Sequence, residues 1–229
     1  MATFSQTWTN PTGNPQNITL PFGVSNLVIQ CWGAGGGGAS MNSTGFGGGG
    51  GGGAFAQTNS ASVAFGTVYS VYVGVAGGKS SNAGNTYVQQ GSNNICLAAG
   101  GFTPTANNSS GAAGGNSLLC IGNVTYSGGN GGKGKSPDSG GGGGGAGTGA
   151  NGGAGGSPAG GSGGASGGGN GGNGLAAGNG SPGSPYGGAG GGSSSIGLST
   201  VGGNGANGAV TISYTYETNI VLNVVSTNF

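Results

Sequence analysis

Residues 128–163 read GGNGGKGKSPDSGGGGGGAGTGANGGAGGSPAGGSG, and glycine makes up 67 of the 229 residues of the whole chain. Fixing one backbone residue costs roughly 1–2 kcal/mol, and glycine loses more freedom than any other residue. Ordering the glycines therefore opposes folding by something on the order of 100 kcal/mol. Between Gly128 and Ser195 the large apolar side chains are Leu175 and Tyr186 alone, so side-chain burial at about 25 cal/mol per Å² cannot offset that cost. Backbone hydrogen bonds must hold this segment together.

One regular structure suits glycine in that role. The polyproline II helix has three residues per turn and leaves its N–H and C=O groups free to pair with neighbouring helices. Without Cβ atoms, several such segments can approach closely and satisfy one another's backbone groups. The composition therefore predicts a packed lattice of polyglycine II helices. A flexible Gly/Ser linker is the alternative.

Collagen also uses this helix, but it needs glycine at every third position without interruption. Here glycine recurs every third residue at Gly128, Gly131 and Gly134, but the next position in this period is Pro137. Such slips indicate short segments joined by turns. The predicted turns are Ser136-Pro137-Asp138, Ser157-Pro158-Ala159, Ser181-Pro182-Gly183 and Ser184-Pro185-Tyr186.

The rest of the chain predicts β-strands, because apolar and polar residues alternate as in Phe4, Gln6 and Trp8 and no window shows a helical period free of glycine. The expected strands cover residues 3–9, 17–20, 26–32, 54–59, 67–74, 85–90, 94–99, 117–121, 123–127, 209–217 and 219–228. The predicted fold class is all-β with a glycine-rich polyglycine II lattice, β-sandwich-like strands at both ends and essentially no α-helix. We expect the strands to cap the lattice, as terminal repeats cap a repeat protein.

The expected organisation is one structural domain with four regions. Residues 1–32 are N-terminal β-strands, residues 33–127 mix strands with glycine-rich segments, residues 128–208 form the polyglycine II lattice, and residues 209–229 form C-terminal strands and a tail.

Charged side chains are almost absent. Lys79, Lys133, Lys135, Asp138 and Glu217 are the full set, without arginine or histidine. Nucleic-acid binding rests on many Lys and Arg contacts to phosphates, so we expect no nucleic-acid partner. No apolar run approaches the roughly 18 residues of a membrane-spanning helix, and the first ten residues lack the basic and apolar parts of a signal peptide. No membrane partner is expected.

Three cysteines, Cys31, Cys96 and Cys120, lie in apolar segments. An odd number far apart does not make a closed disulfide framework, and zinc would want four closely spaced ligands. We expect buried free thiols that act as small hydrophobic residues, and no metal site.

A phosphate-binding pattern appears in residues 129–136, GNGGKGKS, with Lys135 and Ser136 in the reactive positions. That pattern works only at the N-terminus of a helix, and the following Pro137 and glycines cannot form one. Without histidine, and with two carboxylate side chains far apart in sequence, acid–base catalysis lacks its usual residues. We therefore expect neither an enzyme nor a cofactor.

The segment 27–38, LVIQCWGAGGGG, preceded by LPFGV at 20–24, resembles the opening of the glycine-rich domain of bacteriophage tail-fibre and adhesin proteins. Further similar segments follow in order at 47–56, 68–74 and 203–214, so that the resemblance covers roughly residues 18–216. It implies polyglycine helices packed into a compact layer, loops that contact a bacterial surface receptor, and a trimeric assembly. Unlike those adhesins, the chain shows no recognisable fibre-attachment domain and adds an apolar tail, Thr218–Phe229.

The expected function is that of a phage tail-fibre or spike protein of the virion that binds a host cell-surface glycan or outer-membrane protein, with other virion proteins as partners. Candidate loops are residues 41–46, 102–110 and 181–186. Proteins often bind a sugar through an aromatic ring together with side-chain amide or hydroxyl groups. The predicted receptor contacts are therefore Phe102, Asn107, Asn108 and Tyr186.

Two other functions fit the same sequence. A self-assembling virion or filament subunit would use the tail for subunit contacts, through Ile220, Leu222 and Val224, although the tail could equally be an edge strand of the same monomer. An ice-binding protein is a weaker alternative, because it would need a flat, regular Thr/Ala face and the non-glycine positions here mix Asn, Ala, Ser and Lys.

Overall fold

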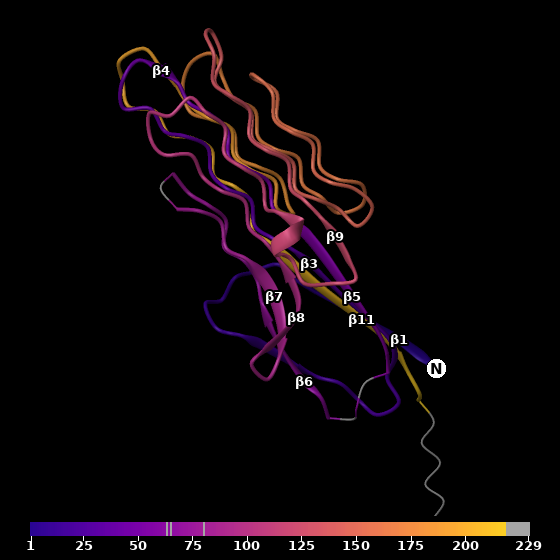
Figure 1. Ribbon diagram of the computed structural model, residues 1–229. Coiled ribbons are helices and arrows are strands. Elements are labelled where there is room, and N and C mark those ends of the chain that lie inside the picture. The colour runs from indigo at the N-terminus through magenta and orange to yellow at the C-terminus, as the bar shows by residue number, and fades with distance from the viewer. Residues whose placement is uncertain (63, 65, 80, 219–229) are drawn as a thin grey trace, which may run out of the picture.

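The computed structural model describes residues 1–62, 64, 66–79 and 81–218. The molecule is elongated, with β-strands in one half and glycine-rich segments side by side in the other (Figure 1). As predicted, the fold is all-β, and the helical structure among the described residues is one 3-10 turn, η1 (Ser117–Leu119).

Two antiparallel sheets face each other in the strand half. The first has the order β1-β11-β3-β5-β9 and the second β2-β6-β7-β8. The first sheet contains β1 (Ala2–Trp8), β3 (Ser25–Trp32), β5 (Phe55–Ser62), β9 (Val124–Tyr126) and β11 (Ala209–Tyr216). The second contains β2 (Gln16–Thr19), β6 (Val68–Tyr72), β7 (Thr86–Gln90) and β8 (Asn93–Ala98). A short pair, β4 (Gly45–Phe46) with β10 (Ser194–Ser195), lies in the glycine-rich half.

The hydrophobic core fills the space between the two large sheets. In β3 the alternating residues Leu27, Ile29 and Cys31 are buried and face the second sheet's Val71 and Val88. This alternation is what a strand half-covered by another sheet requires. The prediction of buried thiols is confirmed for Cys31 and Cys96, whereas Cys120 is only half-buried.

Strands from both ends of the chain are present as predicted, but they meet in one sheet. Trp8 of β1 pairs with Val210 of β11, and Ala2 pairs with Tyr216. The lattice is therefore joined to a single sandwich at one side and is not held between two β caps (Figure 1). The reason is that β11 fits between β1 and β3 and buries its apolar face there.

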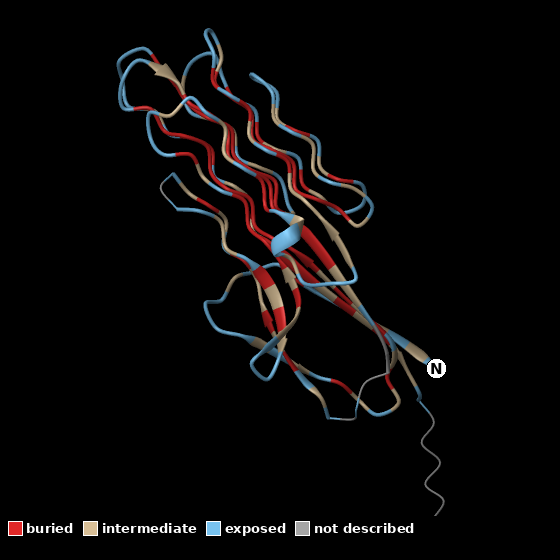
Figure 2. Ribbon diagram, in the orientation of Figure 1, coloured by how far each residue is buried: buried red, intermediate tan, exposed pale blue. Residues whose placement is uncertain are grey.

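Backbone hydrogen bonds in the glycine-rich half repeat every three residues. The N–H groups of the central segment, residues 47–54, point in three directions in turn: toward residues 187–193, residues 99–108 and residues 129–132. Three further segments donate into its carbonyl groups: residues 33–39, 112–115 and 140–146. The central segment thus has three acceptor and three donor neighbours, which surround it on all sides. Buried residues follow these inner segments, while the turns are exposed (Figure 2).

The segments approach too closely for most side chains. A Cβ built on Gly51 would overlap the carbonyl oxygen of Ala113, and one on Gly49 would overlap that of Gly141. The side chains that are fully buried within the lattice are small, such as Ala146, Ala189 and Ser139. Glycine is required here for close approach.

Asparagine side chains replace backbone acceptors where the lattice meets solvent. Asn170 and Asn173, three residues apart, accept the N–H groups of Gly163 and Gly160 at 2.7 and 2.8 Å. The same Oδ1-to-backbone bond is made by Asn82, Asn85, Asn130, Asn151, Asn179 and Asn207. These residues satisfy amide groups that have no neighbouring segment to donate to.

Three of the four predicted proline turns are present. Lys135 and Asp138 exchange backbone bonds around Pro137, Gly156 donates to Ala159 around Pro158, and a turn follows Ser184. The prediction of a turn at Pro182 is wrong, because Ser181 and Gly183 continue a lattice segment and donate to Asn173 and Asn204. Proline fits there because its φ near −65° suits an extended backbone in which this position donates no hydrogen bond.

The prediction of a strand at residues 117–121 is also wrong for most of its length. Asn116 accepts the N–H of Leu118 through its side chain and starts η1, so the backbone turns before Ile121 pairs with Leu97. Leu118 and Leu119 are exposed. The predicted strand at 219–228 lies outside the described residues.

Candidate functional site

The end of the lattice opposite the sandwich gathers loops from distant parts of the chain, and we call it the loop pole (Figure 1). It consists of the turns at residues 41–46, 107–110, 133–139, 157–159, 175–178 and 194–201. The lattice segments between these turns are fixed by backbone bonds, so the loops are presented from a rigid base.

Hydrogen bonds between the turns fix the loop pole further. Asn42 donates its N–H to Asn107 Oδ1 at 2.7 Å, and Met41 and Thr200 exchange backbone bonds. The buried Ser139 Oγ accepts the N–H of Leu175 at 2.7 Å and lies 2.7 Å from the carbonyl oxygen of Gly192. The pole is therefore one connected surface.

The most exposed apolar side chains of the pole belong to one loop. Ile196 is 84% exposed and Leu198 is 73% exposed. The N–H of Gly197 donates to Ser195 Oγ, and that hydroxyl in turn donates to the carbonyl of Leu198. Gly197 has a φ of +111°, which a residue with a side chain adopts only with strain. The loop is thus held in a shape that directs two aliphatic side chains to solvent.

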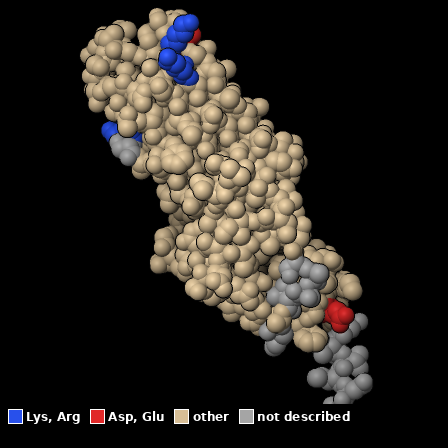
Figure 3. All heavy atoms as spheres, viewed as in Figure 1, with Lys and Arg blue, Asp and Glu red and all other residues tan. Residues whose placement is uncertain are grey.

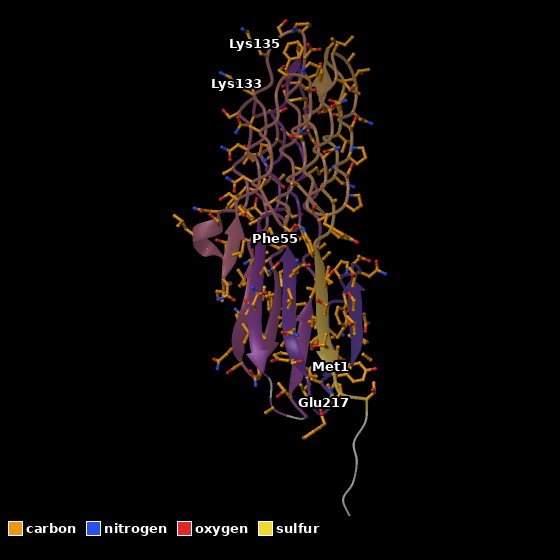
Figure 4. All side chains as sticks on the ribbon, turned by 90° about the vertical axis from the view of Figure 1, so that its right-hand side faces the viewer. Met1, Phe55, Lys133, Lys135 and Glu217 are labelled. Atoms are coloured by element: carbon orange, nitrogen blue, oxygen red, sulfur yellow. The ribbon has the colours of Figure 1, made fainter. Side chains whose placement is uncertain are left out.

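Most of the few charged side chains lie at the two ends of the molecule. Lys133, Lys135 and Asp138 belong to one turn of the loop pole, whereas Glu217 lies at the far end of the sandwich (Figure 4). The face between them carries little charge (Figure 3). An anionic group on a partner would therefore find its cationic complement at the loop pole.

The structure brings together two of the four predicted receptor contacts. Asn107 and Asn108 lie at the loop pole, where their side-chain oxygens accept the N–H groups of Asn42 and Ser110 and so shape the loops. Phe102 lies on the flank, where with Leu119 it lines a hollow of about 320 Å³. Tyr186 lies where the lattice joins the sandwich.

Tyr186 is half-buried against the sandwich. Its ring centroid is 5.7 Å from that of Trp32, and Trp32 packs in turn on Phe55 at 5.1 Å. Phe55 marks this junction in Figure 4. Tyr186 also lines a hollow of about 410 Å³ with Asn10 and Asn207. Its position is remote from the loop pole.

Sequence reasoning missed Ile196 and Leu198. They stand in residues 193–200, SSSIGLST, directly after a glycine run. Two aliphatic residues separated by glycine in a serine-rich stretch do not form a strand pattern. That arrangement was the available sequence signal for an exposed loop.

The glycine N–H groups of the phosphate-binding pattern at 129–136 donate to neighbouring parts of the chain and do not form a phosphate cradle. Gly131 and Gly132 donate to Ala112 and Gly141, and Gly134 donates to Ser109. Among the described residues there is no group of three His, Cys, Asp or Glu side chains that could hold a metal ion. Within the residues that the structure describes, no helix is long and apolar enough to span a membrane.

A family model described as a glycine-rich domain matches residues 9–215. The match covers the lattice and the strands of both large sheets except β1, and the chain belongs to this family. No curated protein matches the sequence.

Proposed function

From the resemblance to phage adhesins and the loop pole, we propose that this protein is a bacteriophage tail-fibre or spike component whose loop pole binds a receptor on the host cell surface. In this proposal the glycine-rich segments are polyglycine II helices. The hydrogen-bond period of three residues supports that assignment, because a helix of three residues per turn presents its N–H groups in three directions.

The observation that carries the proposal is the separation of the two ends. Turns from six parts of the chain meet at the loop pole, while Met1 and Glu217 lie at the opposite end (Figure 4). Other virion proteins bound near Met1 or Glu217 would leave the loop pole accessible. Binding surfaces are commonly built this way, on loops that a rigid scaffold positions.

The exposed side chains favour a protein receptor over a glycan. Sugar sites use an aromatic face, but Phe102 and Tyr186 lie away from the pole, and Phe46, the aromatic residue within the pole, is partly buried. Ile196 and Leu198 offer aliphatic contact area, and Lys133 and Lys135 offer positive charge. An outer-membrane protein with apolar and acidic loops fits this surface better than a saccharide does.

The test uses the full chain carrying a fluorescent label and whole cells from a panel of Gram-negative strains. Saturable binding to a subset of strains is expected, and the double variant Ile196→Ser/Leu198→Ser should lose at least about tenfold in affinity, as for removal of two interface anchors. Leu118→Ser is the matched control, because Leu118 is 88% exposed on the flank. Equal binding by the pole variant, or loss in the control alone, contradicts the proposal. Binding that survives protease treatment of the cells would indicate a glycan.

A homo-oligomer is the second candidate, as a receptor-free structural subunit or as the trimer that the resemblance implies. Exposed apolar residues on the flank, Phe102, Leu118, Leu119 and Ile121, favour lateral contact. The predicted contacts Ile220, Leu222 and Val224 lie outside the described residues. Light scattering on the chain with residues 218–229 removed tests their role: a monomer is expected if they join subunits, and an unchanged oligomer excludes them.

A further inference from the structure

Two buried cysteines face each other across the sandwich. Cys31 lies on β3 of the first sheet and Cys96 on β8 of the second, and both belong to the same core. Cys96 Sγ lies 3.6 Å from the carbonyl oxygen of Ile29 and 3.5 Å from that of Ala56. Ile29 precedes Cys31 by two positions on the same face, and Ala56 is the cross-strand partner of Cys31. The Cys96 thiol therefore lies against the backbone that flanks Cys31, on β3 itself and on the neighbouring β5.

Small residues allow this approach. Ala56 and Ala98, like the two cysteines, are fully buried at this level of the core. Facing sheets are usually about 10 Å apart, but here a cysteine side chain reaches the backbone of the opposite sheet. A close approach of the two sheets is what an inter-sheet disulfide requires, since its Cβ atoms stand roughly 3.5–4.5 Å apart.

Cys120 is the competing partner, and its geometry is different. Its Sγ accepts the N–H of Ala99 at 3.4 Å and donates to the carbonyl of Asn116 at 3.5 Å. Both bonds lie at the outer edge of the second sheet, and neither reaches β3. Cys120 is also half-exposed, whereas Cys31 and Cys96 are fully buried.

We propose that Cys31 and Cys96 are a covalent modification site: local opening of the core admits a small disulfide oxidant such as oxidised glutathione, and an inter-sheet disulfide closes without global unfolding. One cysteine thiolate attacks a sulfur of the oxidant, forms a mixed disulfide and releases one glutathione thiolate. The second cysteine thiolate then displaces the other glutathione. The two cysteines lose two protons and two electrons, and the oxidant becomes two thiols.

This reaction would be slow at neutral pH and faster in alkali. Burial and the neighbouring Cys96 raise the pKa of the Cys31 thiol well above its ordinary range. The attacking thiolate is therefore scarce until the pH rises. A protein made in a reducing cell would stay reduced and acquire the crosslink after release into an oxidising medium.

The experiment treats the native full chain, and its Cys120→Ser variant, with oxidised glutathione at about pH 8.5, near the ordinary pKa of a thiol. In both proteins we expect a Cys31–Cys96 peptide in the digest, and in the variant no free thiol when guanidinium is added. The midpoint of thermal unfolding should rise by about 5–15 °C and return with dithiothreitol.

Three results would overturn the proposal. They are an oxidant-treated chain whose Cys31 and Cys96 still take iodoacetamide once guanidinium has unfolded it, a product that stops at glutathione mixed disulfides, and a Cys96–Cys120 crosslink as the main product. Peptide mapping of the wild-type chain decides the question if the Cys120→Ser variant does not fold.

Discussion

The carbonyl oxygen of Ala113 occupies the space that a Cβ on Gly51 would need. The two residues belong to neighbouring lattice segments, and the same close approach recurs at many glycines. Residues such as Ala146 and Ala189 are buried in the lattice where a methyl group does fit. The lattice is thus specified position by position, and glycines that look alike in sequence differ in what they tolerate.

The variant Gly51→Ala should destabilise the protein by at least about 3 kcal/mol, because the added methyl group meets backbone that cannot move without breaking other bonds. Gly156→Ala is the matched control. A Cβ on Gly156 meets the carbonyl oxygen of Ala159 at an ordinary 3.6 Å, so the variant should be neutral or up to about 1 kcal/mol more stable. Urea unfolding measures both. Similar stabilities for the two variants would refute the packing described here.

The variant Asn170→Ala should cost about 1–2 kcal/mol, because the N–H of Gly163 loses its acceptor. Asn173→Ala should cost a similar amount through Gly160. Asn42→Ala is the control, since no hydrogen bond of its side chain is found within the described residues. Amide exchange should report faster exchange at Gly163 in the first variant alone. Unchanged exchange there would show that the asparagine does not cap the lattice.

Stability should fall in alkali. Burial raises the pKa of the Cys31 thiol well above 9.0 and the pKa of the Tyr69 hydroxyl above 10.0. Both groups stay protonated to a higher pH in the folded chain than in the unfolded one. Their contribution is therefore complete below about pH 9 and is lost as the pH rises from the unfolded toward the folded pKa.

Urea unfolding between about pH 7 and about pH 10.5 measures this decline. The variant Tyr69→Phe removes one of the two groups, so its free energy of unfolding should fall less steeply with pH. An identical slope in the variant would exclude Tyr69 as a source of the effect.

Tyr186 should act in stability and leave receptor binding unchanged. Tyr186→Ala removes the ring that packs on Trp32 and should cost about 1–2 kcal/mol, as expected for a half-buried aromatic pair. Tryptophan fluorescence should change with it. Tyr186→Phe keeps the ring and is the control. If folded Tyr186→Ala lost cell binding, Tyr186 would be a receptor contact and this prediction would be wrong.

Much of the fold follows from local pattern. The alternation Phe4, Gln6, Trp8 predicted a strand, and the breaks in the glycine period at Pro137 and Pro158 predicted turns. Pro182 did not follow that rule, because a proline also fits an extended helix and its surroundings decide which role it takes. Leu118 and Leu119 read as a strand by composition, but the side chain of Asn116 caps a turn there.

The candidate site was less accessible to sequence reasoning. The sequence predicted that Phe102, Asn107, Asn108 and Tyr186 lie in loops, but it did not predict that Asn107 and Asn108 lie at one end of the lattice and the other two elsewhere, because the register between segments sets that position. The exposure of Ile196 and Leu198 at the pole became evident only from the loop conformation that Gly197 and Ser195 fix.

The sequence by itself determined that glycine would be the scaffold, since 67 glycines and few large apolar residues leave backbone hydrogen bonds as the means of order. It also determined the alternating strands, since burial of one face is a local property. Only the tertiary structure decided that both chain ends share one sheet, that asparagines close the lattice edge, and that six turns form one pole. Those outcomes depend on which segment lies beside which, and glycine runs of nearly identical sequence do not encode their neighbours locally.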